Sequence, residues 1–350
     1  MRALTIRPLV ADSLEVSEVP EPIAGDGELL VDGLVVGVCG TDKEIVAGEY
    51  GSAPPGAERL VIGHESLGRV RTAPLDSDFV EGDLVVGVVR RPDPEPCGAC
   101  AHGEFDMCRN GKYTERGIKE LDGFASERWT IETDYAVKLH RRLAEVGVLM
   151  EPTTVVAKAW EQIERIGRRA WFEPRTVLVT GAGPVGLLAA MLGRQRGLDV
   201  HVLDRVSSGP KPVLVENLGA TYHHGGIDTV SARLRPDVVV EATGVGELVM
   251  GAMAGTAAYG IVCLTGVSTG GRRLQVDAGL INRDIVLEND AVVGTVNANL
   301  RHYQQAADAL ARADLAWLNR LVTRRVPLTD FADAFQARPD DVKTVIALDR

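Results

Sequence analysis

The chain has 350 residues, of which 45% are hydrophobic, 25% charged and 5% aromatic, so it is long enough for two domains and too apolar to be disordered. Its formal net charge of −11, with no block rich in Lys or Arg, argues against a nucleic-acid or anionic-membrane surface and favours a small-molecule partner. Met1 leads directly into "RALTIRPLV" without a leader pattern, and no apolar run reaches membrane-spanning length, so we expect a cytoplasmic protein.

The elements change character along the chain. The first 150 residues alternate short apolar runs with Gly, Pro and Asp, as in "ELLVDGLVVGVCG" and "GDLVVGVV", which is typical of short strands and turns. From about residue 154 a helical pattern, "VVAKAWEQIERIG", is followed by apolar runs separated by helix-length segments, which predicts βαβ units and a parallel sheet. Near the end, "RHYQQAADALARA" has the helical period, and "RRVPLTDFADAF" with "VKTVIALD" predicts strand, helix and strand.

Two motifs of the first part carry metal-type donors. Cys39 follows an apolar strand in "GVCGTDKEI", and His64 and Glu65 lie in "VIGHESLGRV"; a thiolate and an imidazole together suit zinc. On an extended chain His64 and Glu65 point to opposite faces, so His64 is the firmer ligand unless the backbone bends there. The alternative is that each residue is simply packed in a core.

Three of the five cysteines lie within twelve residues, as Cys97, Cys100 and Cys108 in "CGACAHGEFDMC". In a reducing compartment such thiols indicate metal ligands or buried groups more readily than disulfides. Tetrahedral structural zinc needs four ligands, and the fourth could come from one of three nearby side chains, namely His102, Glu104 and Asp106. Cys263, inside an apolar run, is better explained as a core thiol.

The second part carries a dinucleotide motif. Gly181, Gly183 and Gly186 form G-x-G-x-x-G between an apolar strand and an amphipathic helix, where free N–H groups at the helix start can face a pyrophosphate. Asp204 ends the next strand, 18 residues after Gly186, where its carboxylate can accept bonds from the ribose hydroxyls. That favours NAD+, while Arg205 leaves NADP+ as a second cofactor. The alternative is a Gly-rich turn in a sheet that binds nothing.

Taken in order, these motifs resemble the zinc-dependent medium-chain dehydrogenases over essentially the whole chain. Within that superfamily "CGTDKEI", "YTERGI", "MEPTTVVAKAWEQ" and "GTVNAN" are most similar to the glucose 1-dehydrogenase branch. The resemblance implies an α/β fold in which a β-rich GroES-like catalytic domain, residues 1–154 and 299–350, accompanies a Rossmann domain with a doubly wound parallel sheet, residues 155–298. It also implies an active site in the cleft between the domains.

The resemblance implies roles for individual residues. Cys39 and His64 would bind catalytic zinc with Glu65 and Glu151 as acidic partners, and Thr41 would help to pass the substrate proton. Glu115, Glu151 and Asn297 match sugar-site positions. In relatives the cysteine lobe commonly reads C-x2-C-x2-C-x7-C; Cys97, Cys100 and Cys108 are matched to its first, second and last ligands, with Gly103 at the third, and we expect the lobe to hold a structural zinc. The cofactor would be held by Gly181, Gly183, Pro184, Val185, Gly186, Asp204, Arg205, Thr243, Gly244, Leu264, Thr265, Gly266, Val296, Asn297 and Lys343.

The sequence therefore predicts an oxidoreductase that uses Zn2+ and NAD+, with NADP+ as a second cofactor, to remove hydride from C1 of an aldose such as glucose and give the aldonolactone. A zinc-dependent polyol or other alcohol dehydrogenase is the alternative in the same class, and a non-catalytic dinucleotide-binding protein is the alternative outside it. The stretch "LDGF", residues 121–124, bears on the choice of substrate, because relatives often carry a His before its Gly. The expected partners are a sugar or polyol and further copies of the chain, as a dimer or tetramer, with no nucleic acid and no membrane.

Overall fold

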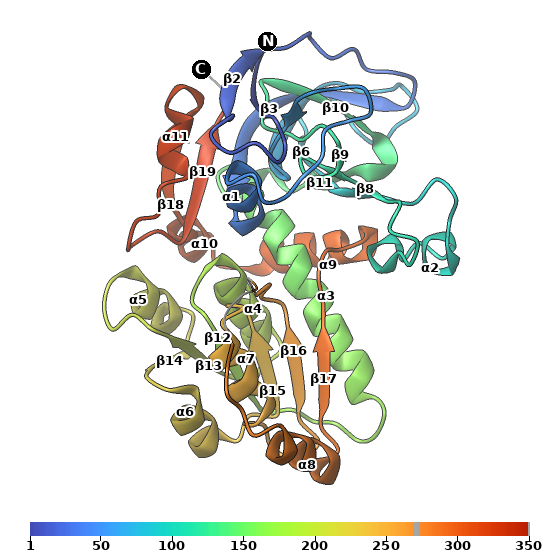
Figure 1. The fold of residues 1–350 in the computed structure, drawn as a ribbon. Coiled ribbons are helices and arrows are strands. Elements are labelled where there is room, and N and C mark those ends of the chain that lie inside the picture. Colours follow the sequence, from blue (N-terminus) through green and yellow to red (C-terminus); the bar gives the residue numbers. More distant parts are fainter. Residues whose placement is uncertain (269, 271–272, 349–350) are drawn as a thin grey trace. The chain divides into compact units, whose positions relative to one another are not determined.

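The computed structural model describes residues 1–268, 270 and 273–348. The chain forms two compact units: residues 1–151 with 298–350 make the first, and residues 152–297 make the second (Figure 1). The sequence-based prediction places these junctions after residues 154 and 298. Among the described residues, no helix is long and apolar enough to cross a membrane.

The first unit is built on a mostly antiparallel sheet of order β11-β6-β5-β3-β19-β18, with β10 also paired to β3. Its longest strand, β3 (Glu28–Val38), alternates buried and half-buried residues and then ends in a fully buried run, as a strand with one face on the core should. The unit's strands are β1 (Arg2–Ile6), β2 (Glu15–Glu18), β3, β4 (Leu60–Val61), β5 (Glu65–Thr72), β6 (Leu84–Gly87), β7 (Arg90–Arg91), β8 (Thr114–Arg116), β9 (Glu120–Leu121), β10 (Arg128–Glu132), β11 (Ala136–Leu139), β18 (Val322–Pro327) and β19 (Lys343–Ala347).

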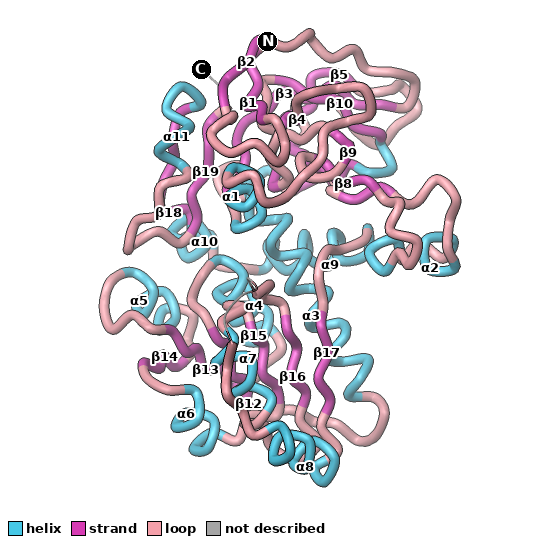
Figure 2. The backbone as a smooth tube through the Cα atoms, viewed as in Figure 1, coloured by secondary structure: helices cyan, strands magenta, loops and turns pink. Residues whose placement is uncertain are grey.

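Two smaller sheets of the first unit have the orders β2-β1-β4 and β7-β8-β9. Short helices lie between the strands, so most of the unit consists of strands and turns, as the sequence predicts (Figure 2). These helices are α1 (Gly40–Val46), α2 (Gly98–Ala101), η1 (Phe105–Met107), η2 (Thr133–Tyr135), η3 (Arg141–Leu143), η4 (Gly147–Leu149), α9 (Leu300–Arg312), α10 (Leu315–Leu321), η5 (Leu328–Asp330) and α11 (Phe331–Ala334).

The C-terminal segment returns into the sheet of the first unit. Strand β19 pairs antiparallel with β3, with Thr344 opposite Val38, and β18 pairs parallel with β19. Figure 1 shows these red strands beside the blue N-terminal ones. Val326 and Ile346 from this segment lie in the same buried cluster as Leu4 and Val36. The return therefore brings Lys343, at the start of β19, to the end of β3.

The second unit contains a parallel sheet of order β14-β13-β12-β15-β16-β17, which is the predicted doubly wound arrangement. Its central strands are continuous buried runs because both faces of the sheet are covered by helices (Figure 2). The strands are β12 (Thr176–Thr180), β13 (Asp199–Asp204), β14 (Thr221–His224), β15 (Val238–Glu241), β16 (Ile261–Leu264) and β17 (Ala291–Gly294), and the helices are α3 (Met150–Gly167), α4 (Pro184–Gln195), α5 (Pro210–Asn217), α6 (Ile227–Leu234), α7 (Gly246–Met253) and α8 (Ala278–Glu288).

Candidate catalytic and metal centres

Cys39, His64 and Glu65 form a compact donor cluster in the first unit. Their ligand atoms all lie within 4.8 Å of one another, and Cys39 Sγ is 3.1 Å from His64 Nε2. Cys39 caps α1 directly after β3, while His64 immediately precedes β5, the neighbour of β3. The two predicted zinc motifs are therefore brought together by strand pairing.

The backbone bends before His64, and this bend puts Glu65 into the cluster. This is the alternative in which the backbone bends: Gly63 has φ +88 and His64 lies outside β5, so the rule for an extended chain does not apply to this pair. A Cβ at Gly63 would approach Val36 Cγ2 to 2.6 Å, so glycine is required for space as well as for conformation. Glycine is also required opposite Glu65, where a Cβ at Gly37 would overlap the Glu65 carboxylate.

Asp42 supports His64 from the far side of its ring and was not predicted. Its Oδ1 is 3.4 Å from His64 Nδ1, and its Oδ2 accepts the backbone N–H of Cys39 at 2.9 Å. Burial would raise the pKa of Asp42, but His64, the Cys39 N–H and Lys343 together outweigh it and lower the pKa. Burial would lower the pKa of His64, but Cys39 and Asp42 hold it well above 6.5. A carboxylate behind a ligating imidazole fixes which ring nitrogen faces the metal.

Lys343 lies in this cluster too. Its buried Nζ forms an ion pair with Glu65 and donates to Val38 O at 3.1 Å. Burial works to lower the pKa of Lys343, but Glu65 and Cys39 more than offset this and raise it. One ammonium therefore faces several acidic groups, and this set of thiol, imidazole and carboxylate fits a divalent zinc ion. The role of Lys343 in cofactor binding stays a prediction.

Glu151 and Thr41 flank the cluster. Glu151 stands in the first turn of α3, and burial raises its pKa to about 7, with His64 lowering it and Glu65 raising it further. Thr41 is the second residue of α1, two positions after Cys39, and is half-buried. The structure thus brings both residues into the neighbourhood of the metal-type donors, while their roles stay predictions.

Glu115 is held by a buried arginine that the sequence analysis missed. Arg90 and Glu115 are direct partners in the pairing of β7 with β8, and Arg90 Nε and Nη2 donate to Glu115 Oε1 at 3.1 and 2.9 Å. The guanidinium stacks 3.6 Å from the Tyr113 ring centroid and also donates to Asp106 O. These contacts fix the Glu115 carboxylate in one orientation.

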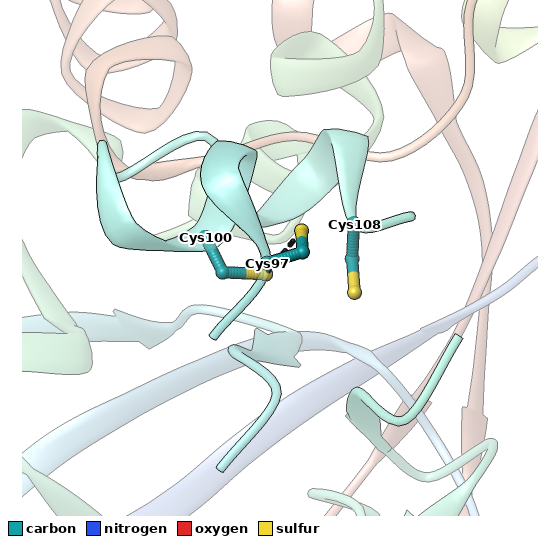
Figure 3. A group of neighbouring side chains, drawn as sticks. All are labelled: Cys97, Cys100 and Cys108. Carbon is teal, nitrogen blue, oxygen red and sulfur yellow. Dashed lines mark hydrogen bonds between the residues drawn. The ribbon is translucent and has the colours of Figure 1, made fainter. Parts of the chain in front are cut away.

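The cysteine lobe holds the second donor cluster. The sulfurs of Cys97, Cys100 and Cys108 lie within 4.8 Å of one another, and Cys97 and Cys100 are 3.7 Å apart (Figure 3). The backbone N–H of Arg109 is the largest influence on Cys97 and helps to lower its pKa to about 6, whereas burial raises the pKa of Cys100 to about 11. Three thiols in this arrangement fit a thiophilic metal.

Gly103 does not occupy a ligand position in this lobe. It has φ +75, and a Cβ built there meets nothing within 4 Å. Two residues separate Cys97 from Cys100 and seven separate Cys100 from Cys108, which are the last two intervals of C-x2-C-x2-C-x7-C. The three cysteines therefore match the second, third and fourth positions of the pattern, and the residue at its first position is Pro94. This corrects the assignment made from the sequence.

The glycine-rich loop of the second unit has the geometry that its motif requires. Gly181 has φ +92, and a Cβ at Gly186 would overlap Gly181 O, so the helix packs closely on the loop. Gly183 caps α4, a Cβ there meets nothing within 4 Å, and Pro184 and Val185 open the helix. The loop is therefore open where a pyrophosphate would approach.

Asp204 is tied to this loop. Its Oδ2 accepts the N–H of Ala182 at 2.6 Å and lies 3.4 Å from Lys211 Nζ, while Oδ1 accepts the N–H of Arg205 at 2.7 Å. Burial raises the pKa of Asp204, but these N–H groups and Lys211 outweigh it and lower the pKa. The carboxylate is thus negatively charged and fixed at the end of β13.

Glu241, another residue missed from the sequence, organises the neighbouring loops. It is fully buried at the end of β15, and its carboxylate accepts the N–H groups of Thr243 at 2.8 Å and Gly244 at 3.1 Å. Its backbone carbonyl accepts N–H bonds from Thr265 and Gly266, directly after Leu264. The acidic residue closing the apolar run "VVVEATG" could have signalled this role.

Val296 and Asn297 end the second unit. Val296 is exposed and its carbonyl accepts a 2.8 Å bond from Lys158 Nζ, while Asn297 has φ 62, in the left-handed region where Asn is enriched. Their predicted contacts with cofactor and sugar stay predictions.

Comparison with known proteins covers nearly the whole chain. Residues 25–141 match the family described as "Alcohol dehydrogenase GroES-like domain", and residues 144–348 match "Glucose dehydrogenase C-terminus". Proteins named glucose 1-dehydrogenase from Methanocella arvoryzae and Thermoproteus tenax are 40% and 42% identical, each over 99% of both chains. A glucose dehydrogenase structure from Haloferax mediterranei, solved with NADP, Zn and gluconolactone, is 34% identical with a TM-score of 0.91 over 100% of both chains.

Proposed function

The chain belongs to the glucose dehydrogenase branch of the zinc-dependent medium-chain dehydrogenases, and we propose that it transfers hydride from C1 of an aldose such as glucose to NAD(P)+, giving the aldonolactone. The observation that carries this proposal is the Cys39–His64–Glu65 cluster in a chain that also holds an intact G-x-G-x-x-G loop. The donor cluster would hold zinc and the glycine loop would bind a nicotinamide cofactor. Zinc and this cofactor together suit the oxidation of an alcohol.

Cys39, His64 and Glu65, with Glu151 as a further carboxylate, would hold the catalytic zinc. When bound, zinc acts as a Lewis acid that lowers the pKa of the sugar's C1 hydroxyl. The protein prepares for this step with its own groups. Asp42 fixes the His64 ring, and Lys343 holds the Glu65 carboxylate by their ion pair.

The proton of the C1 hydroxyl needs a route away from the sugar. Thr41 carries a hydroxyl two residues from Cys39, and a hydroxyl can accept a proton on one side while it donates one on the other. Thr41 therefore passes the proton outward in the proposed mechanism, and hydride leaves C1 for the nicotinamide.

A polyhydroxylated substrate is favoured over a simple alcohol because carboxylates accept hydrogen bonds from sugar hydroxyls. Glu115, held by Arg90, and Glu151 supply such acceptors, and Asn297 adds an amide that both donates and accepts. A polyol dehydrogenase remains the second candidate function, since these acceptors also suit an open-chain polyol.

Cofactor binding is assigned to the glycine loop and to the loops that Glu241 organises. Asp204, with a lowered pKa, accepts bonds from ribose hydroxyls and repels a 2′-phosphate, so NAD+ is the preferred cofactor. Arg205 and Lys211 stand nearby, and they support residual use of NADP+.

The cellular compartment and the oligomeric state of the enzyme are also proposals. All five cysteines are free thiols, which suits the reducing cytoplasm. We expect a homodimer or homotetramer, which light scattering coupled to size-exclusion chromatography would distinguish from a monomer.

A substrate screen tests the proposed function. Aldoses, polyols and simple alcohols are each offered with NAD+ and with NADP+, and reduced cofactor is measured. The proposal expects the highest kcat/KM with an aldose, and lactone as the product. Preference for an open-chain polyol would favour the second candidate, and no turnover of any alcohol by zinc-loaded protein would exclude both.

A further inference from the structure

The three-cysteine lobe has a buried carboxylate beside it that no function described so far uses. Asp93 lies two residues after β7 and four before Cys97, and its side chain is 2% exposed. Its Oδ1 accepts the N–H of Glu95 at 2.8 Å, whereas its Oδ2 is buried and has no hydrogen-bond partner among the described residues. A buried carboxylate oxygen without a partner costs free energy, so we expect this oxygen to bind a cation or to accept a hydrogen bond.

Asp93 is also in contact with the lobe itself. Its backbone N–H faces the sulfur of Cys100. In sequence it adjoins Pro94, the position at which the cysteine pattern of the lobe lacks its first ligand. The carboxylate therefore stands next to the place from which a fourth ligand is missing.

The other candidate ligands near the lobe each contact a group other than the three sulfurs. His102 Nδ1 bonds the carbonyl of Gly98 at 2.7 Å, on its own helical turn. Glu104 pairs with Arg301 at 3.3 Å, and Asp106 accepts a 2.6 Å bond from Asn299. None of these three donors belongs to the group formed by the cysteine sulfurs, whereas Asp93 combines a buried oxygen that makes no hydrogen bond within the described part of the chain with a contact to Cys100.

We propose that Asp93 is the fourth ligand of a zinc site whose other three ligands are Cys97, Cys100 and Cys108. The group of donor atoms within 4.8 Å contains the three sulfurs alone, so the carboxylate must turn toward them when the metal binds. With the carboxylate oxygen of Asp93, the three thiolates would give zinc the four ligands that structural sites usually have. This site does not depend on the substrate of the enzyme.

The test measures metal at the lobe alone, in a His64→Ala background that removes an essential ligand of the catalytic cluster. The variants are Asp93→Ala and the matched control Glu95→Gln, whose carboxylate is exposed and paired with Lys112. Zinc content and chelator competition are measured, and Co2+ is substituted to record its charge-transfer and d–d bands. We expect Asp93→Ala to weaken zinc binding by at least about 10- to 100-fold and Glu95→Gln to leave it unchanged.

A second variant keeps the test decisive if Asp93→Ala folds poorly. Asp93→Cys should retain zinc and shift the Co2+ spectrum to that of four thiolates. The proposal is overturned if Asp93→Ala binds zinc like its parent, if Asp93→Cys leaves the Co2+ spectrum unchanged, or if the parent lobe takes up no metal and instead oxidises to a Cys97–Cys100 disulfide.

Discussion

The two donor clusters of the first unit contain similar side chains on different supports. Cys39 directly follows β3 of the central sheet, and His64 and Glu65 lie where β5 begins. Asp42 contacts His64, and Lys343 forms an ion pair with Glu65. Cys97 and Cys100 lie at the start of and within α2, a four-residue helix, and Cys108 follows η1. Their hydrogen bonds are to one another and to backbone N–H groups.

This difference indicates that the two donor clusters have different roles. A site whose ligands are fixed by a sheet and by charged partners is preorganised before metal arrives, which suits catalysis. A site on short helical turns has little apolar packing of its own and gains order from the metal. The first cluster should therefore control turnover, and the second should control stability.

The largest expected effect is at the preorganised cluster. Replacing His64 by Ala should remove the catalytic zinc and lower kcat/KM by at least about 10³-fold, or ~4 kcal/mol, because the Lewis acid is lost. Isothermal titration should show that dinucleotide still binds, since the glycine loop belongs to the second unit. A folded, zinc-free variant with near-normal kcat would falsify the zinc mechanism.

The lobe should respond in the opposite way. The unmodified chain should carry more than one zinc, and Cys100→Ser should lose the lobe metal while keeping most of its turnover. At free zinc 100 times Kd, a lost site costs about 2.7 kcal/mol. That corresponds to a fall in Tm of roughly 5–10 °C, measured by calorimetry. One zinc per chain, unchanged in Cys100→Ser, would contradict the structural role assigned to the lobe.

Cofactor choice should shift by a smaller amount. Asp204→Gly removes the negative charge from the end of β13 and should move the ratio of kcat/KM toward NADP+ by about 1 to 3 kcal/mol. Steady-state kinetics with both cofactors measures the ratio. The assignment of Asp204 fails if the unmodified enzyme already strongly prefers NADP+, or if the ratio stays the same in the variant.

The smallest effect concerns the sugar. Arg90→Lys loses the two-pronged contact with Glu115 and should raise KM for the aldose by about fivefold, or ~1 kcal/mol, with kcat nearly unchanged. Arg91→Lys is the matched control, because Arg91 pairs with Glu132 instead. Equal KM values in the two variants would mean that Arg90 does not position a sugar-binding group.

Local patterns could be predicted from the sequence, and long-range partners could not. The glycine loop is visible because its turn, close approach and helix start all lie within six residues. Whether Glu65 faces His64 could not be decided from the sequence, because the bend at Gly63 depends on packing against Val36. Asp42 and Glu241 could be suspected only weakly from the sequence. Asp42 is an acidic residue three positions after Cys39, and Glu241 is an acidic residue at the end of an apolar strand.

The ion pair of Lys343 could not be predicted from the sequence, because it joins distant parts of the chain. This pair with Glu65 joins residues nearly 280 positions apart, and only the pairing of β19 with β3 creates it. Aligning the cysteine pattern from its first position directs attention to the residues after Cys100 as candidates for a fourth zinc ligand. The buried oxygen of Asp93, which points to the other end, becomes visible only in the fold.

An isotope measurement tests the proposed transfer of hydride from C1 to the cofactor. Zinc-loaded enzyme is given glucose carrying deuterium at C1 together with NAD+, and the reduced cofactor and the sugar product are analysed by NMR. We expect one deuterium at the nicotinamide C4 for each lactone formed, with a reduced rate wherever hydride transfer limits turnover. Reduced cofactor without deuterium, or a product oxidised at another carbon, would contradict the proposed transfer.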